Sequence, residues 1–446
     1  MTAADVLAEW GLGLTLDHVP GAARDAALRH LLDGLGCAVA AGPDIPAVEV
    51  ARGLGGPPEA TIIGTSCRVG APAAALAGGA LAHMLDFDDT HAGGLVHATA
   101  PVLPVALAVG EETGASGAEV LTAALVGYET ICRLGAAVPH GFHSRGLHAT
   151  SACGVFAAAL VAARLYGLSH GQAVHALGIA GSQAGGLLEF LHTGSSTKQL
   201  HPGLAAHSGI LAARLARAGA TGPASVLEGE YGLYGALLGR PGTDPARGLG
   251  ERWEVTRITI KPYPACQLVH ASLDAARGLA GRAWKIEEIV AEVHQDTAPI
   301  VCGAGKARPR TPYEAKFSLP WSVAAMIVDG DVTVRTYQDM NRPEVAELAE
   351  LVGHQVVPFP GVAADQPGRL RVRFTDGSHA VTEAPRSAGG PDDPDLDHLA
   401  RTKAMGNGLS ERTVERALGL AGLSDLGPLM ADLVDVSDDV REELQR

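Results

Sequence analysis

Residues 85–97, LDFDDTHAGGLVH, bring a carboxylate, a hydroxyl and an imidazole into one short stretch of chain. Asp86 and Thr90 are four residues apart, so at a helix end they would share one face. His97 follows a glycine-containing loop that can fold it back over them. A histidine exchanges protons near neutral pH, and its neighbours can orient it or hold a substrate hydroxyl. The spacing therefore predicts a proton-transfer site around these three residues.

The other acids of this stretch have simpler interpretations. We expect Asp88 and Asp89 to be solvated or to cap a turn. Metal binding by Asp86, Asp88 and His91 is an alternative. Hard-cation loops need several oxygen ligands in a defined order, however, and the EF-hand order is absent from the sequence. We therefore predict a site without a metal ion.

A second segment, GFHSRGLHAT, places two histidines and an arginine just before a helix expected from residue 149. The positive end of a helix beside basic side chains is suited to binding an anion. We favour a functional role for His148, which adjoins the helix start, and Arg145 is a candidate substrate ligand. His143 is explained equally well as part of a capping loop.

Two lysines complete the set of candidates. Lys198 lies in a stretch rich in glycine, serine and threonine, where backbone can approach a ligand closely, and His201 follows it. Lys261 opens the segment KPYPACQLVH, whose prolines hold the chain extended and whose Cys266 and His270 are candidate substrate contacts. A single loop lysine is usually solvated, so it is the combination of segments that indicates an anion site.

Helices must position these segments, because the first half of the chain is rich in alanine and leucine at helical spacing. Ser116 and Ser169 precede two of the expected helices as N-cap residues. Helices are predicted at 21–42, 72–85, 101–113, 117–135, 149–167, 169–180 and 203–218.

The pattern changes near residue 254. Strands are predicted at 254–260, 286–294, 369–375 and 379–383, with helices at 266–280, 319–328 and 343–352 between them. Helical patterns return at 396–404, 410–421 and 426–433. The chain is therefore predicted to be mainly α, with a large all-helical domain (1–255 and 394–446) and a smaller inserted α+β domain (256–393).

Composition limits the possible partners. The formal net charge of −15 implies no general basic surface for nucleic acid, so an anionic substrate needs a local cluster of cations. Six cysteines without a CxxC pair, and a start without a basic n-region, predict a cytoplasmic protein with reduced thiols. The apolar run 149–168 contains Arg164, so we expect a packed helix there and no membrane span.

Four segments in this order, LDFDDTH, HSRGLHATSACGVFAAAL, GSSTKQLHPGLAAHSG and KPYPACQLVHA, resemble the MmgE/PrpD family over essentially the whole chain. The family includes 2-methylcitrate dehydratase, cis-aconitate decarboxylase and iminodisuccinate epimerase. The resemblance implies a helical domain with an α+β lid, a homodimer, and an active site between the domains without metal or organic cofactor. The active-site positions that it implies are Asp86, Thr90, His97, His148, Lys198 and Lys261.

Two positions depart from the decarboxylase members of the family. Where those members carry a histidine shortly after the lysine of the lid domain, this chain has Cys266. Near residues 316–319, an aromatic hydroxyl of the decarboxylase site is replaced by Phe317 or Leu319. Both changes argue against cis-aconitate decarboxylation.

The three activities of the family share a carbanion- or enolate-like centre beside a carboxylate. Such a site must place cations where negative charge grows and a base within reach of the C–H proton. We expect Lys198 and Lys261 to hold carboxylates, and His97 and His148 to exchange the proton. The leading hypothesis is a cofactor-independent lyase of a small polycarboxylic acid, most concretely a 2-methylcitrate-type dehydratase. An epimerase of a small dicarboxylate is the alternative, and a decarboxylase or a non-catalytic binding protein ranks below it.

Overall fold

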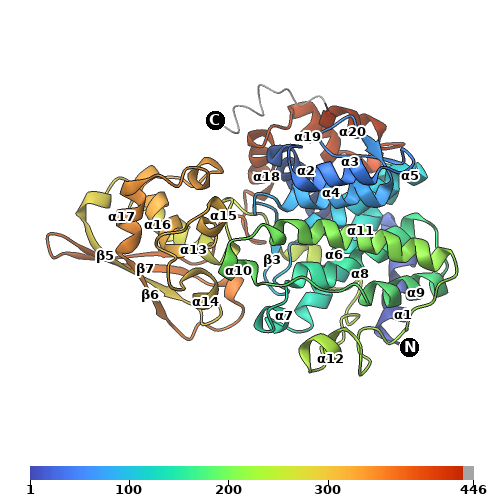
Figure 1. Ribbon diagram of the computed structural model, residues 1–446, viewed down its shortest axis with the longest axis horizontal. Helices are drawn as coiled ribbons and strands as arrows, with labels where there is room; N and C mark the ends of the chain where they lie inside the picture. Colours follow the sequence, from blue (N-terminus) through green and yellow to red (C-terminus); the bar gives the residue numbers. More distant parts are fainter. Residues whose placement is uncertain (435–446) are drawn as a thin grey trace.

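A computed structural model describes residues 1–434, and most of the chain outside one small sheet is helical (Figure 1). The first part of the chain contains twelve α-helices: α1 (Ala3–Gly13), α2 (Gly21–Ala41), α3 (Pro46–Leu54), α4 (Ala71–His83), α5 (Thr99–Thr113), α6 (Gly117–Ala136), α7 (Gly141–Ser144), α8 (Ala149–Leu165), α9 (His170–Gly181), α10 (Phe190–Thr193), α11 (Thr197–Arg217) and α12 (Leu233–Leu238). Two short antiparallel pairs accompany them, β1 (Ala60–Thr61) with β2 (Arg68–Val69), and β3 (Thr90–His91) with β4 (Ile258–Thr259). The mainly helical fold predicted from the sequence is confirmed.

Small residues let the central helices approach closely. Helix α11 packs against α4 and α8, and all three are buried along much of their length. At Gly203 of α11, a Cβ atom would lie 2.2 Å from the carbonyl oxygen of Leu76 in α4, so no larger side chain fits without a backbone shift. This contact sets the start of α11 beside the end of α4, where the candidate acids begin. The predicted N-caps Ser116 and Ser169 are confirmed, and each forms a capping box.

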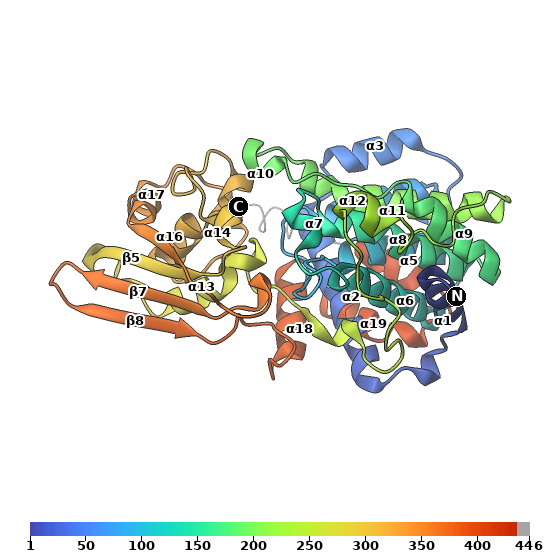
Figure 2. The same ribbon diagram turned by 90° about the horizontal axis from the view of Figure 1, so that it is seen from below.

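The second part of the chain has its own hydrophobic core. Its four-stranded sheet has the order β6-β5-β7-β8, with β5 parallel to β6 and antiparallel to β7. In Figure 2 the sheet extends away from the helical part, and its helices lie on one side of it. The strands are β5 (Ile286–Val293), β6 (Val352–Val356), β7 (Gly368–Phe374) and β8 (His379–Ala384), and the helices are α13 (Gln267–Arg277), α14 (Ala298–Val301), α15 (Pro312–Ala315), α16 (Leu319–Asp329) and α17 (Pro343–Glu350).

The chain then returns to the helical part. Helices α18 (Leu396–Gly406) and α19 (Glu411–Leu418) pack against α2, and α20 (Gly427–Val434) packs against α19. Within residues 1–434 no single helix is both long and apolar enough to cross a membrane, although the sharply bent pair α2 and α3 meets those criteria by length and composition alone.

Three local predictions were wrong. Residues 254–257 form a 3-10 turn instead of a strand, because Glu254 turns inward to meet His91, and only Ile258–Thr259 pair as a strand. Lys198 does not lie in a loop, since α11 starts at Thr197 and continues through Pro202. The predicted helix 343–352 ends at Glu350, and the strand β6 that follows was missed because its burial does not alternate.

Candidate active site

The segment between α4 and β3, residues 85–89, lies where the helical part meets the α+β part, and we call it the acidic loop. Asp86 has a φ of +52°, in the left-handed region that a non-glycine residue occupies only when its surroundings hold it there. Three buried lysines from distant segments hold the acidic loop in this conformation. They donate to three successive carbonyl oxygens: Lys316 to Leu85 (2.6 Å), Lys261 to Asp86 (2.9 Å) and Lys403 to Phe87 (2.6 Å).

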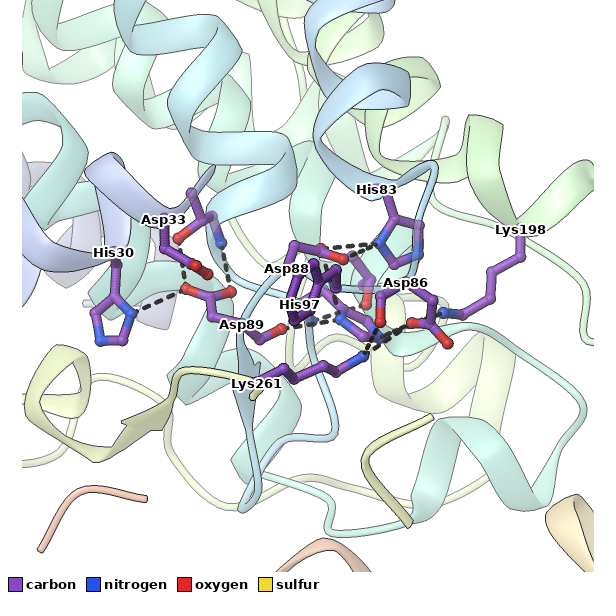
Figure 3. A network of polar contacts seen from close by, with 12 residues as sticks. His30, Asp33, His83, Asp86, Asp88, Asp89, His97, Lys198 and Lys261 are labelled. Atoms are coloured by element: carbon purple, nitrogen blue, oxygen red, sulfur yellow. Dashed lines mark hydrogen bonds and ion pairs between the residues drawn. The ribbon is translucent and has the colours of Figure 1, made fainter. Parts of the chain in front are cut away.

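Asp86 is the electrostatic centre of the site (Figure 3). Its Oδ1 accepts hydrogen bonds of 2.9 Å from both Lys198 and Lys261. Burial alone would raise the pKa of Asp86, but the two ammonium charges outweigh it and hold that pKa well below its usual range. In the described residues, its second oxygen, Oδ2, is buried without a hydrogen-bond partner. Asp86 is therefore an ionised acceptor with one oxygen left open.

The ring of His97 lies beside this pair, and its Nε2 accepts a hydrogen bond from Lys198. Its Nδ1 donates to the carbonyl oxygen of Asp89 at 2.9 Å, so the lone pair of the neutral ring lies on Nε2. Nε2 lies 3.4 Å from the Lys198 ammonium and 3.9 Å from Asp86 Oδ1. Burial and the nearby Lys198 charge hold the pKa of His97 well below its usual value, although Asp88 opposes them. The His97 ring is thus neutral at physiological pH.

The interpretation of Asp88 and Asp89 as solvated residues was wrong, because both side chains are fully buried. Both carboxylate oxygens of Asp88 accept from His83 Nδ1, at 2.9 and 2.8 Å, and Oδ2 also lies 3.5 Å from His97 Nδ1. Asp89 accepts from the backbone and hydroxyl of Thr99. Burial raises the pKa of Asp89 to about 7 in spite of these bonds. Asp88 and Asp89 therefore help to hold His97 in position.

His148 directly precedes α8 at the N-cap position, as its place in the sequence predicted, but its side chain makes no capping hydrogen bond. Its Nδ1 lies 3.0 Å from Nδ1 of His201, in the first turns of α11. One ring must donate and the other accept, so Nε2 of His148 remains available. Burial, reinforced by the Lys198 and His201 charges, holds the pKa of His148 well below its usual value.

A cavity of about 70 Å³ lies against these groups. Six of the predicted site residues line it: Asp86, Thr90, His97, His148, Lys198 and Cys266. Three helices also begin at its wall, since His148 precedes α8, Lys198 is the second residue of α11 and Cys266 precedes α13. Helix starts carry partial positive charge, so the cavity is suited to a carboxylate.

Four predicted residues do not line this cavity. Lys261 is fully buried behind Asp86, and His201 lies behind His148. His270 is buried in α13, where its Nε2 donates to the carbonyl oxygen of Ala265. Arg145 is exposed on the surface.

A second, larger cleft of about 930 Å³ adjoins the cavity. The two spaces share four lining residues: His143, Leu188, Leu191 and Ile300. The cleft reaches the α+β part through the segment from Pro299 to Arg310. The cleft and the cavity therefore meet at these four side chains.

Sequence reasoning missed two buried residues. His83 is one turn before the acidic loop and forms the pair with Asp88, and its Nε2 has no partner among the described residues. Lys316 reaches the acidic loop from the α+β part, and burial lowers its pKa to about 7. The motif LDFDDTH begins just after His83, so extending it by one helical turn would have found that residue. The sequence contains no comparable signal for Lys316, because the residue that it contacts lies 231 positions away along the chain.

The described residues contain two groupings that could hold a metal ion, His83 with His97 and His148, and His83 with Asp86, Asp88 and His97. Lys198 and Lys261 already neutralise Asp86, and Asp88 faces two imidazoles. An added divalent cation would place unbalanced charge in a fully buried site. The donor set therefore fits an anion better than a metal. His91, the third residue of the alternative metal site, instead pairs with Glu254 at 3.1 Å.

The comparisons with known proteins agree with the resemblance. The chain matches the MmgE/PrpD N-terminal domain over residues 5–246 and the MmgE/PrpD C-terminal domain over residues 263–410. It is 29% identical to a cis-aconitate decarboxylase of Aspergillus terreus, over 95% of this chain and 94% of that protein. It is also 32% identical to the Homo sapiens cis-aconitate decarboxylase, over 64% of this chain and 61% of that protein. The chain is an enzyme that belongs to the MmgE/PrpD family.

Proposed function

We propose that this enzyme is a lyase that dehydrates a small 2-hydroxy polycarboxylic acid of the 2-methylcitrate type without a cofactor. One observation carries the choice of a hydroxy acid. Asp86 Oδ2 and Thr90 Oγ1 are both buried, both belong to residues lining the cavity, and neither has a partner in the described chain. An ionised carboxylate can only accept hydrogen bonds, so Asp86 Oδ2 requires a donor.

A substrate hydroxyl supplies that donor. The ionised carboxylates of a polycarboxylic acid offer acceptors alone, and an unsaturated tricarboxylate such as cis-aconitate has no donor at neutral pH. Leaving a buried carboxylate oxygen unpaired costs about 1–3 kcal/mol or more. A 2-hydroxy acid satisfies Asp86 and Thr90 together, while Lys198 and the starts of α8, α11 and α13 hold its carboxylates.

The residues suggest a division of roles. Nε2 of His97 takes the proton from the carbon beside the carboxylate, and the Lys198 ammonium stabilises the charge that grows on that carboxylate. The electron pair then forms the carbon–carbon double bond and expels the hydroxyl. When His201 Nδ1 is the donor of their pair, His148 carries its proton on Nε2 and gives it to the hydroxyl, which leaves as water. The proton that His97 has taken then passes to His148, and both rings are neutral again. Lys261, which does not line the cavity, keeps the Asp86 carboxylate ionised.

The cavity must enlarge to admit such a substrate. Its volume of about 70 Å³ is room for roughly two water molecules, whereas small-molecule sites usually exceed ~300 Å³. The α+β part contributes Cys266, Gln267 and Ile300 to the wall. We propose that this part acts as a lid that moves away to open the site and returns to exclude water.

Decarboxylation is the second candidate, favoured by the near full-length similarity to a protein named cis-aconitate decarboxylase. Against it, the wall of the cavity carries a thiol at Cys266 and a phenyl ring at Phe317, where the decarboxylase members were expected to carry an imidazole and a phenol. Epimerisation would use the same proton removal but return the proton to the same carbon.

Proton NMR in D₂O with citrate, 2-methylcitrate, cis-aconitate and iminodisuccinate separates these reactions. New vinyl signals from a hydroxy acid, with loss of water, support dehydration. Itaconate-like signals and CO₂ from cis-aconitate identify a decarboxylase, and Cα–H exchange without elimination identifies an epimerase. Lys198→Ala should abolish turnover while the exposed Lys285→Ala control keeps it. Equal activity of Lys198→Ala and wild type would rule out the proposed site.

A further inference from the structure

The cavity has an apolar side as well as a polar one. Leu188, Leu191 and Ile300 line both the cavity and the adjoining cleft, and each is partly exposed. Phe190, Leu268 and Phe317 extend this apolar wall inside the cavity. Among the lining residues, all within the described chain, Lys198 is the only lysine or arginine. Strong charge is therefore confined to one end of the cavity.

One further leucine extends the apolar surface into the cleft. Leu187, in the same segment as Leu188 and Leu191, lines the cleft and leaves 66% of its surface exposed. A polycarboxylate gains nothing from these side chains, because its charged groups lose hydration against them. An aliphatic group gains from each methylene that it buries there.

We propose that the substrate carries an aliphatic substituent longer than methyl. Its carboxylates and hydroxyl occupy the end of the cavity formed by Asp86, Thr90 and Lys198. The substituent passes between Leu188, Leu191 and Ile300 into the cleft. This inference rests on the proposed function and names the class of its substrate, an alkyl-substituted hydroxy polycarboxylic acid.

The volumes agree with this arrangement. The cavity alone leaves no room for a long substituent, whereas the cleft of about 930 Å³ holds one without strain. Two charged groups of the cleft wall are already neutralised, since Arg308 pairs with Glu350 and Arg310 with Glu314. Lys306 is the remaining lysine or arginine of that wall.

The test is a series of steady-state measurements of kcat/KM with citrate and with 2-alkylcitrates bearing methyl, propyl and pentyl substituents. Each methylene buried against the leucines should raise kcat/KM about threefold to fourfold, which corresponds to ~0.8 kcal/mol per CH₂. Leu191→Asn and Ile300→Thr should flatten this dependence. Leu54→Asn, at an exposed position of α3 outside both spaces, should keep the full dependence.

The outcomes separate this inference from the proposed function. If citrate is dehydrated and longer substituents bring no gain, or the two variants keep the wild-type dependence, the alkyl subsite is wrong and the dehydratase stands. If none of the four acids is dehydrated, both proposals fail.

Discussion

The Lys261 ammonium donates to the carboxylate and to the backbone carbonyl oxygen of Asp86, at 2.9 Å in each case. This double contact holds both the charge of Asp86 and its left-handed backbone conformation. Lys198 reaches the same carboxylate oxygen from α11. The two lysines therefore differ in role, since Lys198 lines the cavity and Lys261 supports it from behind.

Replacing Lys261 by Met should destabilise the protein and inactivate it. Removing one partner of a buried ion pair leaves an uncompensated charge, which typically costs ~3–5 kcal/mol of unfolding free energy. Urea unfolding and kcat/KM measure the two effects. In the double variant with Asp86→Asn, stability should recover in part and activity should not. A Lys261→Met variant as stable as wild type would show that the pair does not hold the loop.

Asp88→Asn should reduce kcat with little change in KM. Asp88 contacts the Nδ1 atoms of His83 and His97 without lining the cavity, so the loss falls on the orientation of the base. A hydrogen bond to a charged group is worth about 1.5–3 kcal/mol, so kcat should fall roughly tenfold to 100-fold. The exposed Asp44→Asn variant is the matched control. An equal rise in KM would instead indicate direct substrate contact.

The pH profile should reflect the lowered pKa of His97. Burial and the Lys198 charge favour the neutral ring, so the base form persists below the ordinary histidine pKa of 6.5. kcat/KM should therefore stay level as pH falls through 6.5, and its acidic limb should lie lower. An acidic limb centred at 6.5 or above would remove His97 from the role of base.

Stability should rise with pH above neutrality because of Lys316. Burial lowers its pKa from 10.5 to about 7 in the folded protein. Between these two values the unfolded chain binds one more proton than the folded chain, so unfolding becomes less favourable as pH increases. Melting curves at pH 7 to 10 should show this gain for wild type, and Lys316→Met should lose it. Parallel curves for the two proteins would contradict the buried, neutral lysine.

Gly203→Ala should disturb the site from a distance. The new Cβ would meet the Leu76 carbonyl oxygen at 2.2 Å and push α11 away from α4. Overpacking of this kind costs about 1–3 kcal/mol, and it displaces Lys198 at the start of α11. Both Tm and kcat should fall. In the control Gly171→Ala the new methyl group meets nothing within 4 Å, so neither quantity should fall.

The sequence predicted most helices because their alanine and leucine patterns are local properties. Lys198 shows where such reasoning stops, since the surrounding glycine, serine and threonine residues suggested a loop, whereas packing against α4 extends the helix to Thr197. Six of the ten candidate residues line one cavity. They could be identified from the sequence because the segments that carry them follow one another in a characteristic order.

The acids show a second limit. Asp88 and Asp89 looked like surface residues, because nothing local reveals that His83, Thr99 and the fold around them replace water. Arg145 and His270 were predicted as substrate contacts because of their side-chain chemistry, but the direction in which each side chain points depends on packing. Whether a polar residue faces a cavity is a property of the assembled structure.

The three lysines that hold the acidic loop also set an order of events during synthesis. Lys261, Lys316 and Lys403 follow the loop at increasing distance, and the last contact spans 316 residues. A nascent chain shorter than about 400 residues lacks one of the three anchors, so the acidic loop gains its full set of contacts only after α18 has emerged. Truncation before residue 403 should therefore leave the helices able to collapse but the loop without its full support.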